Sequence, residues 1–406
     1  MKKCVLFTDS YPYGFKESFL ETEITFLSKA FDVIYIFSLS FSEKIRTVPK
    51  NVYVFSLHVS DMRFRHIKKI LSGIVSHGMK IDRHNLFDVF QCIYFRGGVN
   101  FSVNKAKRII AKNNIDLDGA VFYTYWAGFL SCVAMRLCES LQKNCVIVSR
   151  AHAVDLYDYR QKRGFSPFQN YIVRNLTSIC PISNDGKQYL INKYPNFTNK
   201  IHLHRLGTLD CGLNPLSETC SFNVVSCSNI IPLKRTPLIL NSLVLASKSI
   251  PSVRWYCFGD GECLNQLKKA ALDLKFSDQV SFFGRIDNSA ILDFYKNNKV
   301  DLFINLSEVE GLPVSIMEAM SFGIPCLATD VGGTKEIVND VNGFLLPKNI
   351  NESDVAKKII EYCNLSNESK QEKRTNARNF WLKNYDSNLN YDNWCRFLLS
   401  LIECEK

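Results

Sequence analysis

Short apolar runs alternate with longer amphipathic segments along almost the whole chain. In the first half, five runs rich in β-branched and aromatic residues have the length of buried strands. Residues 16–31 carry apolar side chains at steps of three and four, which predicts a helix lying on a sheet, and residues 61–113 are expected to be mostly helical. The five strand-like runs are residues 4–8, 33–38, 120–124, 145–149 and 178–183.

A second series of strand-like runs begins near residue 222, and each run is followed by a helix-like segment. Strands that alternate with helices predict parallel sheets with right-handed crossovers. Two such series predict an α/β protein of two Rossmann-like, doubly wound domains that face a central cleft, where the carboxyl ends of the strands bind ligands. The runs of the second series are residues 222–228, 253–259, 280–284, 300–306, 325–330 and 342–347.

The length of the chain also favours two domains, since 406 residues exceed the usual size of one compact domain. The polar, turn-rich residues 210–221 mark the junction. We expect an N-terminal domain over residues 1–210 and a C-terminal domain over residues 211–385. A final amphipathic helix is predicted within residues 386–406.

Composition places the chain among ordinary globular proteins, with 46% hydrophobic and 22% charged residues. The 15 cysteines include no Cys-x-x-Cys pair, which is typical of reduced thiols in a cytoplasmic protein. The apolar run at the start is too short for a signal peptide, and no stretch has the apolar length of a membrane-spanning helix. The sequence therefore predicts a cytoplasmic location.

The net charge of +11 is concentrated in the first half of the chain. Residues 1–200 contain 28 Lys and Arg against 15 Asp and Glu. No compact run of basic residues with interleaved aromatics is present, so nucleic acid is not expected as a partner. A basic half is most often an ordinary solvated surface, and it is also typical of proteins that bind a phosphorylated ligand or an anionic membrane. Our hypothesis is peripheral contact with an anionic membrane at the inner face of the plasma membrane.

The most informative segment is residues 301–347. A buried strand runs into the turn that holds Glu310 and Gly311, and Pro313 suits the first turn of the helix that follows. A helix start after a strand end offers free backbone N–H groups and a positive dipole to an anion. Glu318 lies about two helical turns further on and about 80° away around the axis, so the two carboxylates should hold different parts of one ligand.

This segment resembles the signature of the GT-B glycosyltransferases of family 4. The resemblance implies that Glu310 is catalytic and contacts the donor sugar, while Glu318 binds the ribose hydroxyls of the nucleotide. The backbone near Gly311, Leu312 and Pro313 would then contact the sugar or its diphosphate. No metal and no cofactor is implied.

Residues 224–240 resemble a second element of the family, the loop that neutralises the donor diphosphate. The family's lysine falls on Lys234, which becomes a further catalytic candidate. The family's arginine position is occupied by Asn229. Either Arg235 supplies the second positive charge, or Asn229 contributes a hydrogen bond.

Two further loops of the second half resemble parts of the family's donor site. Gly259 lies at a strand–turn–helix junction, where glycine permits a tight turn and close ligand approach. The loop at Gly284, Arg285 and Ile286 resembles the one that supports the nucleotide base in the family.

In the first half, His152 follows a predicted strand, and the resemblance implies a catalytic contact with the donor sugar or the acceptor. Histidine transfers protons near neutral pH. Arg150 and Asp155 are close in sequence and are candidates for the acceptor side, as is Gly14 in the loop after the first strand. Glu17 is expected to be a helix-start carboxylate placed for the helix dipole.

The resemblance implies retaining transfer of a sugar from a nucleoside-diphosphate donor to a glycan or polyprenyl-diphosphate-linked acceptor. The loop after the first strand is similar to variants found in bacterial surface-polysaccharide (O-antigen and capsule) synthesis. In this family the last helix, within residues 386–406, packs back onto the first domain.

Three other classes of protein make different demands on the sequence. A nucleotide-sugar 2-epimerase of the same fold would act without an acceptor. A non-catalytic sugar-nucleotide-binding protein would not need Lys234, Glu310 and Glu318 together. A dinucleotide-dependent oxidoreductase would need a Gly-x-Gly-x-x-Gly motif after the first strand, which this sequence lacks.

Overall fold

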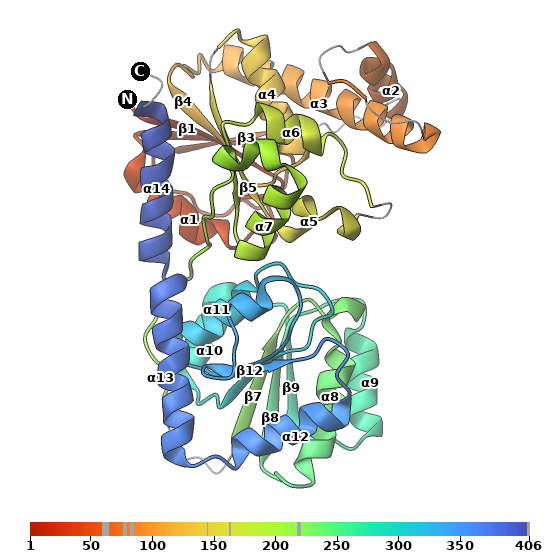
Figure 1. Ribbon diagram of the computed structural model, residues 1–406, viewed down its shortest axis with the longest axis vertical. Coiled ribbons are helices and arrows are strands. Elements are labelled where there is room, and N and C mark those ends of the chain that lie inside the picture. The colour runs from red at the N-terminus through yellow and green to blue at the C-terminus, as the bar shows by residue number, and fades with distance from the viewer. Residues whose placement is uncertain are drawn as a thin grey trace. The chain divides into compact units, whose positions relative to one another are not determined.

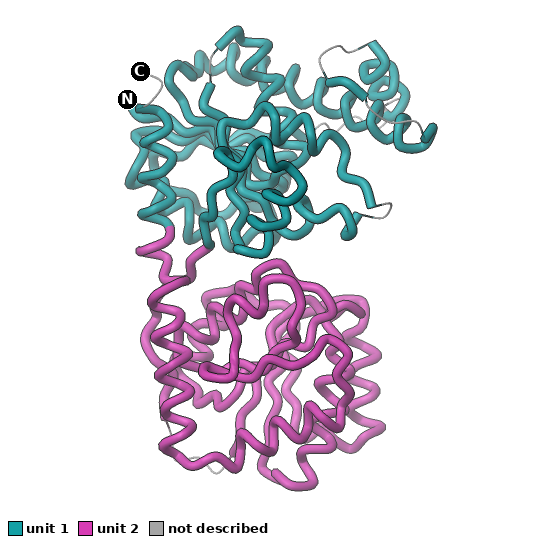
Figure 2. Tube along the Cα trace, in the orientation of Figure 1, with its two compact units in different colours: residues 1–205, 391–406 teal, residues 206–390 magenta. Residues whose placement is uncertain are grey.

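A computed structural model describes the chain in two compact units. Unit 1 comprises Met1–Arg205 and Tyr391–Lys406, and unit 2 comprises Leu206–Asn390 (Figure 2). The described residues are 1–58, 65–75, 79–81, 85–143, 145–161, 164–216 and 221–403. Residues 61–64, 217–220 and 404–406, which belong to three of the segments predicted above, lie outside them.

Unit 1 is built on a six-stranded sheet in the order β3-β2-β1-β4-β5-β6, and every strand pairs in parallel with its neighbours. The strand order reverses between the central strands β1 and β4. The topological switch point of the sheet therefore lies at the carboxyl ends of these two strands. The strands are β1 Lys3–Thr8, β2 Val33–Ser38, β3 Val52–Ser56, β4 Ala120–Thr124, β5 Val146–Ala151 and β6 Ser178–Pro181. The helices are α1 Leu20–Ala30, α2 Arg65–Val75, α3 Leu86–Lys112, α4 Phe129–Ser140, α5 Ala153–Leu156, α6 Gln169–Asn175 and α7 Asn184–Lys193.

Unit 2 repeats the same architecture with the order β12-β11-β10-β7-β8-β9, again parallel throughout (Figure 1). Its switch point lies between β7 and β10. The strands are β7 Phe222–Cys227, β8 Val253–Phe258, β9 Val280–Gly284, β10 Leu302–Asn305, β11 Cys326–Thr329 and β12 Gly343–Leu346. The helices are α8 Thr236–Ser247, α9 Leu264–Asp273, α10 Asn288–Asn297, α11 Val314–Ser321, α12 Glu352–Cys363 and α13 Asn367–Asn384.

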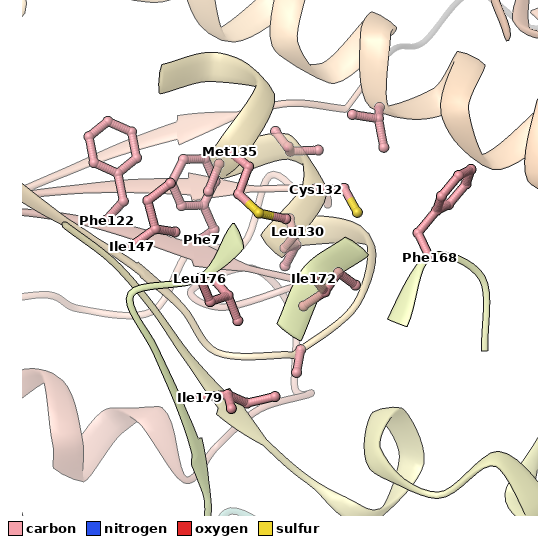
Figure 3. Packing of buried hydrophobic residues seen from close by; sticks show 14 of the residues in the cluster. Phe7, Phe122, Leu130, Cys132, Met135, Ile147, Phe168, Ile172, Leu176 and Ile179 are labelled. Carbon is pink, nitrogen blue, oxygen red and sulfur yellow. The ribbon is translucent and has the colours of Figure 1, made fainter. Parts of the chain in front are cut away.

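The predicted α/β class with two doubly wound parallel sheets is confirmed. All eleven predicted runs contain a strand, because strands covered by helices on both faces read as continuous apolar runs. In unit 1, side chains of β1, β4 and β5 meet those of α4 and α6 in one cluster, seen around Phe7, Phe122 and Met135 in Figure 3. The prediction missed only β3, in which Val52 is buried, Tyr53 is exposed and the remaining residues are half-buried.

The last helix, α14, spans Ser387–Glu403. Tyr391, Trp394 and Leu398 on this helix are buried in a cluster with Leu20 and Leu27 of α1. This is why residues 391–406 belong to unit 1 although they end the chain. Among the described residues, no helix combines the length and the apolar character needed to cross a membrane.

Candidate functional site

Lys234 and Glu310 lie together at the switch point of unit 2. Lys234 ends a short 3₁₀ turn in the loop after β7, and Glu310 lies in the loop after β10. The Lys234 Nζ atom donates to Glu310 Oε1 at 2.5 Å. The side chains retain 21% and 11% exposure, so both are accessible to a ligand at this edge of the sheet.

Two polar residues that the sequence analysis did not single out hold the Glu310 carboxylate. Asn305 Nδ2 donates to Glu310 Oε1 at 3.1 Å, and Ser307 Oγ donates to the same atom at 2.6 Å. Asn305 ends strand β10 and Ser307 follows it, so both face the switch point. A polar residue at the end of a buried strand was the signal available in the sequence.

The turn at Glu310 is fixed by a glycine pair from another loop. Gly332 has a φ of +54°, and a Cβ atom there would lie 2.1 Å from the carbonyl oxygen of Glu310. Gly333 N donates to the carbonyl oxygen of Gly311 at 2.7 Å. Any side chain at position 332 would push the Glu310 turn away, which gives the pair a structural role.

Helix α11 begins directly after this turn. Leu312 and Pro313 are buried, and Pro313 precedes the first helical residue, Val314, instead of lying within the first turn. The first N–H groups of α11 therefore start beside Glu310, where they can meet a ligand anion.

Glu318 lies further along α11 and has a different partner from Glu310. Its Oε1 accepts a hydrogen bond from Asn288 Nδ2 at 2.7 Å. Burial raises the pKa of Glu318 to about 7, against the opposing effect of the bond from Asn288. The two carboxylates thus have separate environments, as their spacing predicted.

Replacing Glu318 with Gln is expected to raise the free energy of unfolding of the ligand-free protein by about 2 kcal/mol at about pH 8. Between the ordinary pKa of 4.5 and the raised value of about 7, the unfolded chain loses its proton first, so native stability falls as the pH rises. Glutamine keeps the acceptor for Asn288 and removes the charge. Chemical denaturation at about pH 5 and about pH 8 measures this difference; an equal effect at both values would contradict it.

Arg235 does not fit the predicted role at the donor diphosphate. Its Nε donates to the carbonyl oxygen of Leu306 at 2.6 Å, and its Nη1 donates to that of Lys348 at 2.8 Å. The guanidinium therefore joins three loops, with its donors directed at backbone oxygens. Asn229 is exposed in the same loop after β7, which leaves Lys234 as the cation suited to a phosphate.

The glycines after β8 and β9 bring two more loops to this edge. Gly259 has a φ of +130°, and a Cβ atom there would lie 1.8 Å from the carbonyl oxygen of Ser228. Gly259 N donates to the carbonyl oxygen of Gly284 at 2.8 Å. Arg285 is exposed and Ile286 is half-buried in the following residues. The predicted donor-side residues other than Glu318 on α11 therefore lie at the ends of β7, β8, β9 and β10 and in the loops that follow them.

His152 lies in unit 1 among aromatic rings at the end of β5. Its ring centroid is 4.7 Å from that of Tyr125 and 4.6 Å from that of Trp126. Burial lowers the pKa of His152 to about 3, with a smaller contribution from the positive charge of Arg150. The imidazole is therefore neutral near pH 7. Its Nε2 atom is buried, and among the described residues none makes a hydrogen bond to it.

Asp155 positions the His152 loop. One carboxylate oxygen accepts from His152 N at 2.6 Å, and the other accepts from Ala127 N in the loop after β4. Burial raises the pKa of Asp155 to about 7 in spite of these bonds. Both oxygens accept hydrogen bonds within unit 1, which gives Asp155 a positioning role at the His152 loop, and its place on the acceptor side stays a prediction.

The prediction that Arg150 lies on the acceptor side is wrong. Arg150 is fully buried, and its guanidinium pairs with Glu23 of α1 at 3.4 Å and donates to Tyr123 Oη at 2.9 Å. It also lies over the ring of Trp394 in α14, 4.2 Å from the centroid. The strand alternation explains the error, because Arg150 points to the side of the sheet that α1 and α14 cover.

The prediction for Glu17 is also wrong, because α1 begins three residues later, at Leu20. Glu17 is buried with a φ of +56°, and its carboxylate accepts from the backbone N–H groups of Ser10 and Tyr11, both at 2.6 Å. Its other oxygen accepts from Trp126 Nε1. Gly14 lies in the same loop with a φ of +65°, a conformation that favours glycine.

Comparison with known proteins finds similarity in the C-terminal half of the chain. Residues 219–380 match the family described as Glycosyl transferases group 1. The O-antigen biosynthesis glycosyltransferase WbnH of Escherichia coli is 34% identical over 157 residues, which cover 38% of this chain and 41% of that protein. The UDP-Gal:alpha-D-GlcNAc-diphosphoundecaprenol alpha-1,3-galactosyltransferase of Escherichia coli is 32% identical over 109 residues, 26% of this chain and 27% of that protein. The chain thus spans less than half of the length of the curated relatives it matches here, 41% and 27% for these two.

Solved structures extend the likeness to the whole chain. Anabaena HepE in complex with UDP has 17% identity and a TM-score of 0.67, with coverage of 98% of this chain and 100% of that chain. The low identity limits this likeness to the fold, and the family match covers most of unit 2. Residues 219–380 of this chain are thus similar to the family of glycosyl transferases group 1, and the chain as a whole has the GT-B fold of the solved structures that it resembles.

Proposed function

We propose that this protein is a retaining glycosyltransferase that transfers a sugar from a nucleoside-diphosphate donor to a glycan acceptor. The observation that carries the proposal is the Lys234–Glu310 pair at the switch point of unit 2, beside the first turn of α11. This place holds a cation, a carboxylate and the free backbone N–H groups of a helix start. These are the groups that bind a sugar diphosphate.

In this proposal, Lys234 and the N-terminus of α11 bind the donor diphosphate. The bond between the sugar's anomeric carbon and the diphosphate oxygen breaks, and the acceptor hydroxyl oxygen bonds to that carbon. The acceptor proton passes to the departing diphosphate on the same face of the sugar. Positive groups placed before the reaction stabilise the charge that grows on the diphosphate.

The two carboxylates take different roles. Glu310, held by Asn305 and Ser307, binds the sugar once Lys234 turns to the diphosphate. Glu318 is two helical turns away and accepts from the ribose hydroxyls, replacing its bond from Asn288. The loops at Gly259, Gly284, Arg285 and Ile286 receive the nucleotide base.

Unit 1 is proposed to bind the acceptor. His152 is neutral near pH 7, so it contributes a hydrogen bond through Nε2 and not the proton of an imidazolium. Gly14 and the loop held by Glu17 lie after β1, at the same edge of the sheet as His152.

The name of one Escherichia coli relative includes a diphosphoundecaprenol acceptor and a UDP donor, and that of the other includes O-antigen biosynthesis. We propose that this protein likewise uses a UDP-sugar donor and a polyprenyl-diphosphate-linked acceptor. The reaction would take place at the cytoplasmic face of the membrane in surface-polysaccharide synthesis.

A panel of UDP-, GDP- and ADP-sugars tests the proposal. With an acceptor glycan present, the protein is expected to release nucleoside diphosphate in proportion to acceptor. Isomerisation of the sugar without acceptor would indicate an epimerase instead. Binding of a nucleotide sugar without either product would indicate a non-catalytic binding protein.

A further inference from the structure

Four aromatic rings gather at the carboxyl ends of β4 and β5 in unit 1. They belong to Phe19 before α1, Tyr125 and Trp126 after β4, and His152 after β5. The centroids of all six pairs of these rings are at most 6.4 Å apart. We call these four residues the aromatic cluster. Because β4 borders the switch point of this sheet, the aromatic cluster lies where a ligand of unit 1 would bind.

Trp126 is the member of the aromatic cluster that best offers a surface to a ligand. Tyr125 is fully buried and His152 is 8% exposed, whereas Trp126 and Phe19 are half-buried. The rings of Trp126 and Phe19 are inclined at 71° to each other, so a ligand that stacks on one meets the edge of the other. The indole of Trp126 has the larger face of the two.

The rest of unit 1 holds the Trp126 indole in one orientation. Its Nε1 atom donates to Glu17 Oε1. The carbonyl oxygen of Trp126 accepts from Gly128 N at 2.9 Å and from Ser131 Oγ at 3.1 Å. A ring that is fixed before binding loses little conformational freedom when a ligand stacks on it.

Glu17 also brings a second carboxylate, that of Asp9, to this place. Asp9 follows the last residue of β1, and its backbone N donates to the same Glu17 Oε1 atom at 3.2 Å. Its carbonyl oxygen accepts from Ser40 Oγ at 2.9 Å. Asp9 is exposed, and within the described part of the chain no group makes a hydrogen bond to its carboxylate. Asp9 and Trp126 therefore meet at one oxygen atom, at the switch point between β1 and β4.

The backbone of Glu17 shows that this arrangement is strongly held. Its φ of +56° lies in the left-handed region, which residues with a Cβ atom seldom adopt. Such a conformation persists only where the surroundings hold it. Here the Glu17 carboxylate accepts five hydrogen bonds, from the backbone N–H groups of Asp9, Ser10 and Tyr11, from Ser10 Oγ and from Trp126 Nε1.

An aromatic face beside a carboxylate suits the recognition of a sugar. The C–H groups on the face of a pyranose ring are attracted by the negative face of an aromatic ring. The hydroxyls of the sugar donate hydrogen bonds, and a carboxylate accepts them strongly. A nucleotide base would also stack on the indole, but the Asp9 carboxylate would repel its phosphates.

We propose that Trp126 and Asp9 bind a sugar unit of the acceptor. One face of the pyranose ring stacks on the Trp126 indole, and two of its hydroxyls donate to the Asp9 carboxylate. Glu17 is a positioning residue, which holds both groups without touching the sugar. The proposal rests on the transfer function proposed above, because it names the residues of unit 1 that recognise the acceptor.

Binding of simple glycosides to the full chain tests the proposal without requiring turnover. The probes are the methyl glycosides of glucose, galactose and N-acetylglucosamine, and ligand-observed NMR measures their dissociation constants. At least one is expected to bind the wild-type protein. Trp126→Leu should raise its dissociation constant about tenfold, whereas Trp126→Phe, which keeps an aromatic face, should change it by no more than about threefold. Asp9→Asn should raise it about tenfold, because the charged acceptor is lost.

The two Trp126 variants separate stacking from a structural role. Both lose the hydrogen bond to Glu17, so a purely structural role would weaken binding equally in both. Tyr53→Leu and Asp392→Asn are matched controls that should bind as the wild type does, because these residues are exposed on β3 and α14 of unit 1. Wild-type affinity in Trp126→Leu, equal losses in the two Trp126 variants, or no binding of any of the three glycosides would overturn the proposal.

The outcome can be distinguished from that for the transfer reaction. Glycoside binding that depends on Trp126 and Asp9, in a protein that releases no nucleoside diphosphate, would support this sugar site and contradict the transferase. Acceptor-dependent release of nucleoside diphosphate, with unchanged glycoside affinity in Trp126→Leu and Asp9→Asn, would support the transferase and contradict the sugar site.

Discussion

Replacing Lys234 with Met is expected to lower the rate of acceptor-dependent nucleotide release by about 10²- to 10³-fold. In the proposed mechanism the lysine ammonium stabilises the charge that develops on the leaving diphosphate, and methionine keeps the side-chain length without the charge. Replacing Glu310 with Gln is expected to have a similar effect, because the carboxylate is held in place by Asn305 and Ser307 for the sugar. Initial rates at saturating donor and acceptor measure both effects.

Two controls separate this effect from a loss of folding. Lys248 follows the last residue of α8, at the other end of the helix from Lys234, and Lys248→Met should retain the wild-type rate. The double variant of Lys234 and Glu310 should lose less than the product of the two single losses, because the residues are in contact. A Lys234→Met enzyme with near wild-type turnover would contradict the proposed role.

Replacing Arg150 with Met is expected to lower the free energy of unfolding by about 3 to 5 kcal/mol. The change leaves the Glu23 carboxylate buried without its partner, in a place where water cannot reach it. Burial already raises the pKa of Glu23, even though Arg150 lowers it. The change also removes the guanidinium from the Trp394 ring, which weakens the attachment of α14 to unit 1.

A double-mutant cycle with Glu23→Gln distinguishes a charge effect from lost packing. The double variant should recover most of the stability, since no unpaired charge remains. Arg254→Met provides the matched control, because Arg254 is also on a strand but is exposed, and its loss should cost no more than about 0.5 kcal/mol. Wild-type stability in Arg150→Met would show that the buried pair does not hold α14.

The fold could be predicted from the sequence because its strands are buried on both faces. A run such as Cys4–Thr8 is apolar at almost every position, and the alternation with amphipathic helices leaves few other arrangements. The short strand β3 was missed because it lies at the edge of the sheet, where Tyr53 is exposed and the apolar signal is weak.

Candidate site residues could be named where the signal, a charged side chain in a turn after a strand, lies within one short segment of the sequence. Glu310 was singled out by its place in the turn before a helix start, and Lys234 by the resemblance of residues 224–240 to the family's phosphate-binding loop; the parallel sheet brings both turns to one edge. The prediction for Arg150 failed because its partner, Glu23, is distant in sequence, and the Arg235 guanidinium is likewise directed at a distant backbone oxygen, that of Lys348. A single sequence does not show which basic side chains already bind carboxylates or backbone oxygens elsewhere in the folded chain.

The most direct test of the central claim is a crystal structure of the protein with a bound nucleoside diphosphate. We expect a phosphate oxygen within hydrogen-bonding distance of Lys234 Nζ and of the first N–H groups of α11, with the ribose hydroxyls at Glu318. The Lys234–Glu310 bond should then be open. A nucleotide bound at any other edge of unit 2, with this ion pair still closed, would contradict the account.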